Sequence, residues 1–336
     1  MANKNKWIQN TSPDQPVSEF ARQVISLRLK SVWHYLQLAA LESDDDVEYV
    51  HQLRVATRRA DSSISIFKKL LPKNVTRSIR KQLRRARQAA GNARDLDVLF
   101  QRLQEGREKY PDIVIRRVIK QAKLRRGSAQ KPLLKIHSKL KQDRFKRKIK
   151  AIVRSIKWRD KAPEPTIGQI AQSSLGQFVD EFFAAAASDL TDISALHKMR
   201  IRGKKLRYAM ELLTGVFGPS MRSELYPTFA EVQDKLGRIN DHDTARRLFE
   251  KWDQSSRRGN QLARLREMEC LKLKEECNSF QRYWTRERAA ELEKLFESLL
   301  VLPFQFVTET ASPDSNGDRT SHGIQQSDPP SEVAPV

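Results

Sequence analysis

The chain of 336 residues carries a formal net charge of +22, because 63 lysines and arginines outnumber 41 aspartates and glutamates. It has no run of about 18 uncharged apolar residues, which argues against a membrane-spanning helix, and residues 1–16 lack the apolar run of a secretory signal. Cys270 and Cys277 would lie about 10 Å apart along one predicted helix, too far apart to bridge. Free thiols are typical of a reducing compartment, so we expect a cytoplasmic protein.

Helix-forming residues dominate the composition, and no alternating strand-like run occurs. In the first part of the chain the pattern predicts helices at about residues 17–42, 47–71, 74–109 and 112–157, the last of them broken near Gly127 and Pro132. After a linker at 160–165, further helices are predicted at about residues 166–188, 193–217, 221–254 and 257–299. Residues 1–16 and 307–336 have little apolar content, so we expect two disordered tails, the second of them acidic.

One sequence pattern occurs twice, 146 residues apart. The first copy is His51-x-x-Arg54-x-x-x-Arg58-Arg59, and the second is His197-x-x-Arg200-x-x-x-Lys204-Lys205. Gly91-x-x-Arg94-Asp95 and Gly237-x-x-Asn240-Asp241 follow at the same offset. Asp46 and Asp192 each lie five residues before the histidine, where either side chain can accept the free amides of a first helical turn. The repeat, with four predicted helices in each part of the chain, favours an all-α fold of two similar halves packed together, at about 17–160 and 161–306 of one helical region, 17–306.

Both copies of the pattern predict amphipathic helices with a cationic polar face. Steps of 100 degrees per residue place Arg54 and Arg58 within about 60 degrees of His51, opposite an apolar arc. Arg59 and Lys205 fall inside the apolar arc, where an unpaired cation is costly to bury. Asp95 and Asp241 recur at the same offset and are the partners that we expect for these two cations.

A further cationic stripe is predicted in the first half only. Arg80, Arg84, Arg87 and Arg94 share one face of the predicted helix 74–109, whereas the matching second-half positions are not basic. Residues 116–159 are also rich in lysine and arginine, either as a solvated helix face or as a ligand contact. The cationic surface is therefore expected to be lopsided.

These side chains suit a polyanion made largely of phosphate. Guanidinium groups bind phosphate oxygens through paired hydrogen bonds, lysine supplies a mobile charge, and histidine donates hydrogen bonds. Spacings of i, i+3 and i+7 place such contacts about 5 Å apart along a helix, which suits an extended phosphate chain. The candidate binding residues are His51, Arg54, Arg58, Arg59, Arg80, Arg84, Arg87, Arg94, His197, Arg200, Lys204, Lys205 and Arg207.

Together these motifs resemble the CHAD domain, the conserved histidine α-helical domain, over about residues 17–300. The resemblance is carried by the two histidine motifs, by Gly91-x-x-Arg94-Asp95-Leu-Asp97-Val98 and by Leu236-Gly237-x-x-Asn240-Asp241. It implies an all-α fold of two pseudo-symmetric antiparallel four-helix bundles around a basic groove, binding of inorganic polyphosphate, and association with polyphosphate granules. Asp61 stands where the pattern of the second half has Arg207, which implies weaker binding at that point. The signature of the CYTH domain, to which some members are fused, is missing, so a stand-alone module is expected.

Two other classes of function remain open from the residues alone. A nucleic-acid binder would also be basic, although residues 116–159 contain only Phe145 and Trp158 as aromatic stacking groups. A metal-dependent phosphohydrolase could use Asp241-His242-Asp243, but no further His-Asp pair or carboxylate cluster completes such a site. We therefore expect a binding protein that is not an enzyme and that uses no cofactor or metal, with polyphosphate as its partner and nucleic acid as the alternative.

Overall fold

The computed structural model describes residues 6–9, 11–43, 46–105, 112–254 and 262–301, and all of them belong to one unit, Met1–Gln305. Within these ranges every regular element is a helix, and the only β pairing is an isolated bridge between Pro16 and Thr166. The all-α prediction is confirmed. The predicted acidic tail, 307–336, lies outside the described residues. None of the described helices has the length and apolar content to cross a membrane.

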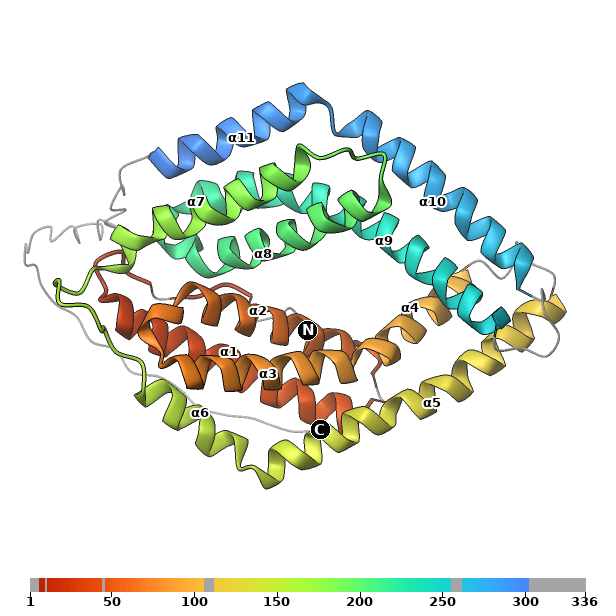
Figure 1. Cartoon of the computed structure of the whole chain (residues 1–336), viewed down its shortest axis with the longest axis horizontal. Coiled ribbons are helices and arrows are strands. Elements are labelled where there is room, and N and C mark those ends of the chain that lie inside the picture. Colours follow the sequence, from red (N-terminus) through yellow and green to blue (C-terminus); the bar gives the residue numbers. More distant parts are fainter. Residues whose placement is uncertain (1–5, 10, 44–45, 106–111, 255–261, 302–336) are drawn as a thin grey trace, which may run out of the picture. The chain divides into compact units, whose positions relative to one another are not determined.

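The first set of helices packs around α1 and α2 (Figure 1). Its elements are α1 (Val17–Leu41), α2 (Glu48–Ile66), the short 3-10 helix η1 (Lys68–Leu70), α3 (Lys73–Ala89), α4 (Gly91–Glu105), α5 (Asp112–Gln142) and α6 (Phe145–Arg154). α1 contacts α2, α5 and α6, and it buries Phe20, Leu29 and Leu36 completely. Burial of side chains of this size supplies most of the stability of such a bundle.

The second set packs around α7, α8 and α9 (Figure 1). Its elements are α7 (Ile167–Ala186), α8 (Ile193–Phe217), the π-helical turn η3 (Met221–Leu225), α9 (Tyr226–Gln254), α10 (Ala263–Tyr283) and α11 (Arg286–Val301). Phe182, Phe229 and Phe296 meet edge to face in its core, with ring centroids 5.0 and 5.7 Å apart. Gly218 follows the last residue of α8, and its φ of 81° is a conformation that glycine adopts without strain. Both cysteines lie on α10 as free thiols.

The structure confirms the two helix starts that were predicted upstream of the histidines. Asp46 Oδ1 accepts a hydrogen bond from the Glu48 amide at 2.8 Å, and Asp192 Oδ1 accepts one from the Ser194 amide at 2.9 Å. Each carboxylate satisfies an amide that the first helical turn leaves without a partner. The histidines consequently sit at nearly the same depth, His51 as the fourth residue of α2 and His197 as the fifth residue of α8.

The predicted break near Gly127 and Pro132 is wrong, because α5 runs through both residues. Pro132 and Ser128 are exposed, so water can reach the Ser128 carbonyl that loses its helical donor at Pro132. The break comes instead at Arg144, which has a left-handed φ of 52°. Two other long predicted helices are also divided, 74–109 near Ala90 and 257–299 near Trp284, while their parts 106–109 and 257–261 lie outside the described residues.

The expectation of a disordered segment 1–16 does not hold for its described residues. Ile8 is buried in the core, and Trp7 packs edge to face on Tyr226 with ring centroids 4.7 Å apart. Pro13 O accepts a hydrogen bond from the Gly168 amide at 2.8 Å. A few apolar side chains in a polar stretch are thus enough to hold this segment against the second set of helices.

The two sets of helices meet mainly through α2 and α8, with smaller contacts between α1 and α7 and between α4 and α9. α2 and α8 carry the two histidine motifs, so the contact brings both copies together (Figure 1). The origin of the two sets by duplication stays a prediction.

Candidate polyanion-binding site

A central cleft of about 460 Å³ opens where α2 and α4 of the first set face α8 and α9 of the second. Its predicted site residues come from both copies of the pattern: His51, Arg54, Arg58, Arg94, Arg200, Lys204 and Arg207. Arg238, which the sequence analysis did not select, also lines the cleft. Seven of the predicted residues, which lie far apart in the sequence, therefore line one space.

Three further cavities are joined to the central cleft, directly or through one another, by shared lining residues. A connecting cavity of about 280 Å³ shares Arg58, Arg200 and Lys204 with the cleft. An α3 cavity of about 970 Å³ shares Asp61, Arg80 and Arg87 with the connecting cavity. On the other side, a lateral cavity of about 500 Å³ shares Asp95, Asn240 and Thr244 with the central cleft. We call these four cavities together the basic trough.

Every predicted site residue except Arg59 lines the basic trough. His197 lies in the lateral cavity and Lys205 in the connecting cavity. Arg80 and Arg87 line both the connecting and the α3 cavities, and Arg84 lines the α3 cavity. The two histidines therefore occupy neighbouring cavities rather than the same one.

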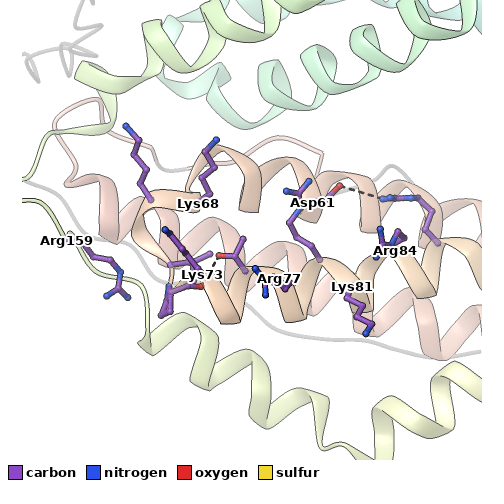
Figure 2. A pocket seen from close by; sticks show the side chains of 13 residues that line it. Asp61, Lys68, Lys73, Arg77, Lys81, Arg84 and Arg159 are labelled. Carbon is purple, nitrogen blue, oxygen red and sulfur yellow. Dashed lines mark hydrogen bonds and ion pairs between the residues drawn. The ribbon is translucent and has the colours of Figure 1, made fainter.

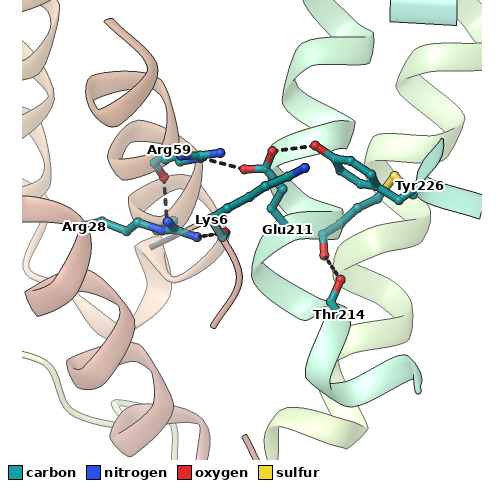
Figure 3. A network of polar contacts seen from close by, with 8 residues as sticks. Lys6, Arg28, Arg59, Glu211, Thr214 and Tyr226 are labelled. Carbon is teal, nitrogen blue, oxygen red and sulfur yellow. Dashed lines mark hydrogen bonds and ion pairs between the residues drawn. The ribbon is translucent and has the colours of Figure 1, made fainter. Parts of the chain in front are cut away.

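The position and the expected partner of Arg59 are both corrected by the structure. Its Nε donates to Glu211 Oε2 at 2.6 Å, and Tyr226 OH donates to Glu211 Oε1 at 2.8 Å (Figure 3). Both charged side chains are buried, at 8% and 1% exposure. Asp95 lines the central cleft instead. The apolar arc of α2 faces α8 at this point, so the carboxylate on α8 is the nearer partner.

Lys205 also has a different partner from the one expected. Its Nζ lies 4.0 Å from Glu181 Oε2, and its side chain is half exposed. Its long side chain therefore carries the charge out of the apolar arc to solvent, and it needs no buried carboxylate. The same carboxylate binds the Arg202 guanidinium.

Asp95 and Asp241 act on cations of the cleft. Burial lowers the pKa of Arg54 and Asp95 opposes this shift; likewise, burial lowers the pKa of Arg200 to about 10 and Asp241 opposes it. Burial raises the pKa of Asp95, with the charge of Asp241 adding to the rise. The two carboxylates thus balance part of the positive charge on one side of the cleft.

Several polar atoms in the cleft are buried without a hydrogen-bond partner among the described residues. They include Nε of Arg200 and Nε of Arg207. Leaving a buried donor unsatisfied costs about 1–3 kcal/mol, and more for a charged group. An anion in the cleft would accept these hydrogen bonds.

Gln233 is a cleft residue that sequence reasoning missed. It is 2% exposed, and neither its Oε1 nor its Nε2 has a hydrogen-bond partner within the described chain. Its place depends on Gly203, because a Cβ at that position would lie 1.9 Å from Gln233 Nε2. The available signal was its position 146 residues after Arg87, together with a glycine inside the second histidine motif.

Comparison with known proteins identifies the family. The model of the CHAD domain family matches residues 13–250. The chain belongs to the CHAD domain family. The crystal structure of the CHAD domain from the plant Ricinus communis is 20% identical, covers 88% of this chain and 95% of its own, and superposes with a TM-score of 0.63. PptA from Streptomyces chartreusis is 15% identical, covers 85% of this chain and 99% of its own, and gives a TM-score of 0.53. A search of curated proteins finds no match.

Two groups in the cleft of this CHAD domain hold protons weakly. Burial, with the charges of Arg94 and Lys204, lowers the pKa of His51 to about 4. Burial, with the charges of Arg200 and Arg58, lowers the pKa of Lys204 to about 6. Both groups are thus mainly neutral at pH 7 in the absence of an anion, because their charged forms are desolvated among like charges.

In the Asp241-His242-Asp243 segment, the side chains of His242 and Asp243 contact other residues of the protein. His242 is buried with its Nδ1 2.6 Å from Glu269 Oε2. Asp243 binds Arg246 and Arg247, each at 2.9 Å. Among the described residues, no three histidine, cysteine, aspartate or glutamate side chains are grouped as metal ligands.

Proposed function

We propose that this CHAD domain binds inorganic polyphosphate along the basic trough, with the central cleft as its tightest part. The observation that carries the proposal is the convergence of seven predicted residues from both halves on one cleft. The family is associated with polyphosphate binding, which supports this choice of polyanion. Cytoplasmic function at polyphosphate granules is the biological setting that we propose.

The composition of the cleft favours a phosphate chain over a nucleic acid. Of the described residues, those that line the central cleft include no phenylalanine, tyrosine or tryptophan side chain. Nucleic-acid sites without sequence preference normally offer aromatic rings on which bases stack. A chain of phosphates needs only charge and hydrogen-bond donors, which this cleft supplies.

The mechanism is electrostatic capture with release of counterions. Each phosphate that a lysine or arginine neutralises releases condensed cations, so the binding constant falls as a power of the salt concentration. CHAD domains are generally binding domains, and no chemical step on the phosphate is proposed here.

Salt and competition test this proposal. If about 6–10 phosphates are held, the affinity for labelled long-chain polyphosphate should fall about 10³-fold between 50 and 200 mM salt. Unlabelled polyphosphate should displace the label at physiological salt, whereas duplex DNA and RNA at the same phosphate concentration should not. Equal displacement by nucleic acid would indicate that the site binds nucleic acid, which is the alternative function. Release of orthophosphate in the presence of divalent metal would instead indicate a phosphohydrolase.

The affinity for long-chain polyphosphate should also fall as the pH rises from about 6 to about 8. Below about pH 6 Lys204 is already charged, so binding takes up no proton there. Above that pH the free amine is neutral and binding must add a proton, which costs up to tenfold in affinity per pH unit for one group. His51 adds to the dependence in the same direction wherever the bound anion raises its pKa into this range.

Calorimetry in two buffers of different ionisation enthalpy will count the protons taken up. Lys204→Arg is the control, because arginine stays charged and should remove the contribution of this position. An affinity that is constant from pH 6 to 8, with no proton uptake, would contradict the role of Lys204.

A further inference from the structure

The α3 cavity is the largest of the four cavities in the basic trough, and most of its cations are absent from the predicted site. It lies between the end of α2, η1 and α3, with one side chain from the segment after α6 (Figure 2). Apart from Asp61, all of its charged lining residues are lysines or arginines. The cations outside the predicted site are Lys68, Lys69, Lys73, Arg77, Lys81 and Arg159.

The positive charge of this cavity is not balanced within the protein. Arg80 Nε donates to Asp61 Oδ1 at 2.8 Å, and Arg87 Nη1 lies 3.9 Å from Asp61 Oδ2. The one carboxylate that lines the cavity therefore pairs with Arg80 and Arg87 and not with the other cations. None of the six cations named above forms an ion pair with another described residue. The Arg159 guanidinium is held in place by two carbonyl oxygens, of Leu70 at 3.3 Å and Ser155 at 2.8 Å, which leave its charge uncompensated.

The second set of helices has no lysine or arginine at the matching described positions. The residues 146 positions after Lys68, Lys69, Lys73, Arg77 and Lys81 are Thr214, Gly215, Pro219, Ser223 and Pro227. The N-terminal segment covers that region, since a Cβ on Gly215 would lie 2.9 Å from Thr11 Cβ. Trp7 packs nearby on Tyr226. The fold therefore does not require cations here, and their presence on one side only is a feature of this sequence.

The α3 cavity continues the path of the central cleft. Asp61, Arg80 and Arg87 line both the α3 and the connecting cavities, and Arg58 and Arg200 line both the connecting cavity and the cleft. A flexible linear anion that leaves the cleft on this side meets cations in both cavities, and Asp61, which lines both, is paired with Arg80 and Arg87. On the other side, the lateral cavity sets Lys198, Arg247 and Lys251 against Asp95 and Asp243, so its excess of cations is smaller than that of the α3 cavity.

We propose that the α3 cavity is a second phosphate-binding region for polyphosphate that extends beyond the central cleft, so that this protein selects long chains over short ones. The inference rests on the proposed function and specifies its ligand. A long chain fills both regions at once, and its affinity gains from the second region as in any linked binding. Tripolyphosphate is too short to occupy both regions at once, so its affinity lacks this gain.

The triple variant Lys73→Gln, Arg77→Gln, Lys81→Gln tests the inference. These exposed residues lie on α3 and line the α3 cavity without lining the cleft. Loss of three contacts should make the salt slope for long-chain polyphosphate shallower by about 2, and should lower its affinity on the order of 10- to 100-fold at physiological salt. The affinity for tripolyphosphate should change by less than about twofold.

A matched control carries the same change of charge on α5. Lys131→Gln, Lys135→Gln, Lys139→Gln removes exposed cations that line none of the four cavities, and it should bind both ligands as the wild type does. An equal loss in both triple variants, or an equal loss for tripolyphosphate, would overturn the inference. Weaker binding of duplex DNA alone in the α3 variant would also overturn it, and would assign the cavity to nucleic acid.

The inference and the proposed function can fail separately. If Arg200→Glu abolishes binding of long-chain polyphosphate and the α3 variant binds like the wild type, only the second region is wrong. If the wild type binds no polyphosphate, the proposed function fails and the second region fails with it.

Discussion

Arg200→Glu is expected to lower the affinity for long-chain polyphosphate about 100-fold or more while the protein stays folded. Arg200 lines both the central cleft and the connecting cavity, and its Nε has no hydrogen-bond partner within the described residues. A charge-assisted hydrogen bond contributes about 1.5–3 kcal/mol, and reversal adds repulsion of the phosphate to its loss. Every 1.4 kcal/mol is tenfold in affinity, so a 100-fold loss is a conservative expectation.

The fold should tolerate this reversal because Arg200 lies among like charges. Burial, followed by the charge of Arg58, lowers the pKa of Arg200 to about 10. A glutamate at this position would attract Arg58 and Lys204, whereas the arginine repels them. Circular dichroism and the urea midpoint should therefore remain at wild-type values, as binding is lost. Arg54→Glu on α2 should behave in the same way.

Arg282→Glu is the control, because Arg282 is exposed on α10 and lines none of the four cavities. The same change of charge there should lower the affinity only slightly, through the general field of the protein. Comparable losses from Arg200→Glu and Arg282→Glu would mean that binding is diffuse, and the central cleft would lose its assigned role.

The site could be predicted from the sequence as far as helical periodicity reaches. His51, Arg54 and Arg58 share one face of α2, and the structure places all three in the central cleft. The repeat placed Arg200 and Lys204 on a second helix, although only the packing of α2 against α8 shows that both faces share a space. The polar face of a helix follows from residue spacing, whereas the pairing of faces depends on tertiary contacts.

The remaining errors come from interactions between distant residues. α5 stays helical past Gly127 and Pro132, where Arg126 binds Asp97 at 2.6 Å and Gln130 donates to carbonyls at the end of α1. Helix propensity takes account of the proline but not of these tertiary contacts. Likewise, the burial of Arg59 followed from its position in the apolar arc, while Glu211, its partner, lies 152 residues away.

Removal of Glu211 is expected to cost about 3–5 kcal/mol in the free energy of unfolding, because it leaves a buried guanidinium without its counter-charge. Glu211 accepts from Arg59 at 2.6 Å and from Tyr226 at 2.8 Å, on opposite sides of the contact between the two sets of helices (Figure 3). Lys6 adds a further positive charge nearby, and its pKa is lowered by burial while Glu211 opposes the shift. Urea unfolding of Glu211→Leu measures the loss directly.

The double variant Arg59→Met, Glu211→Leu separates the cost of breaking the ion pair from the value of the pair itself. Replacing both charged partners by apolar side chains of similar volume is often nearly neutral, so most of the lost stability should return. The double variant should also bind long-chain polyphosphate as the wild type does, because neither residue lines the basic trough. Stability losses that simply add would show that the two charges are not coupled. A loss of affinity in a stably folded double variant would show that Arg59 contributes to binding, as the sequence-based prediction has it. Its assignment to the interface between the two sets of helices would then be wrong.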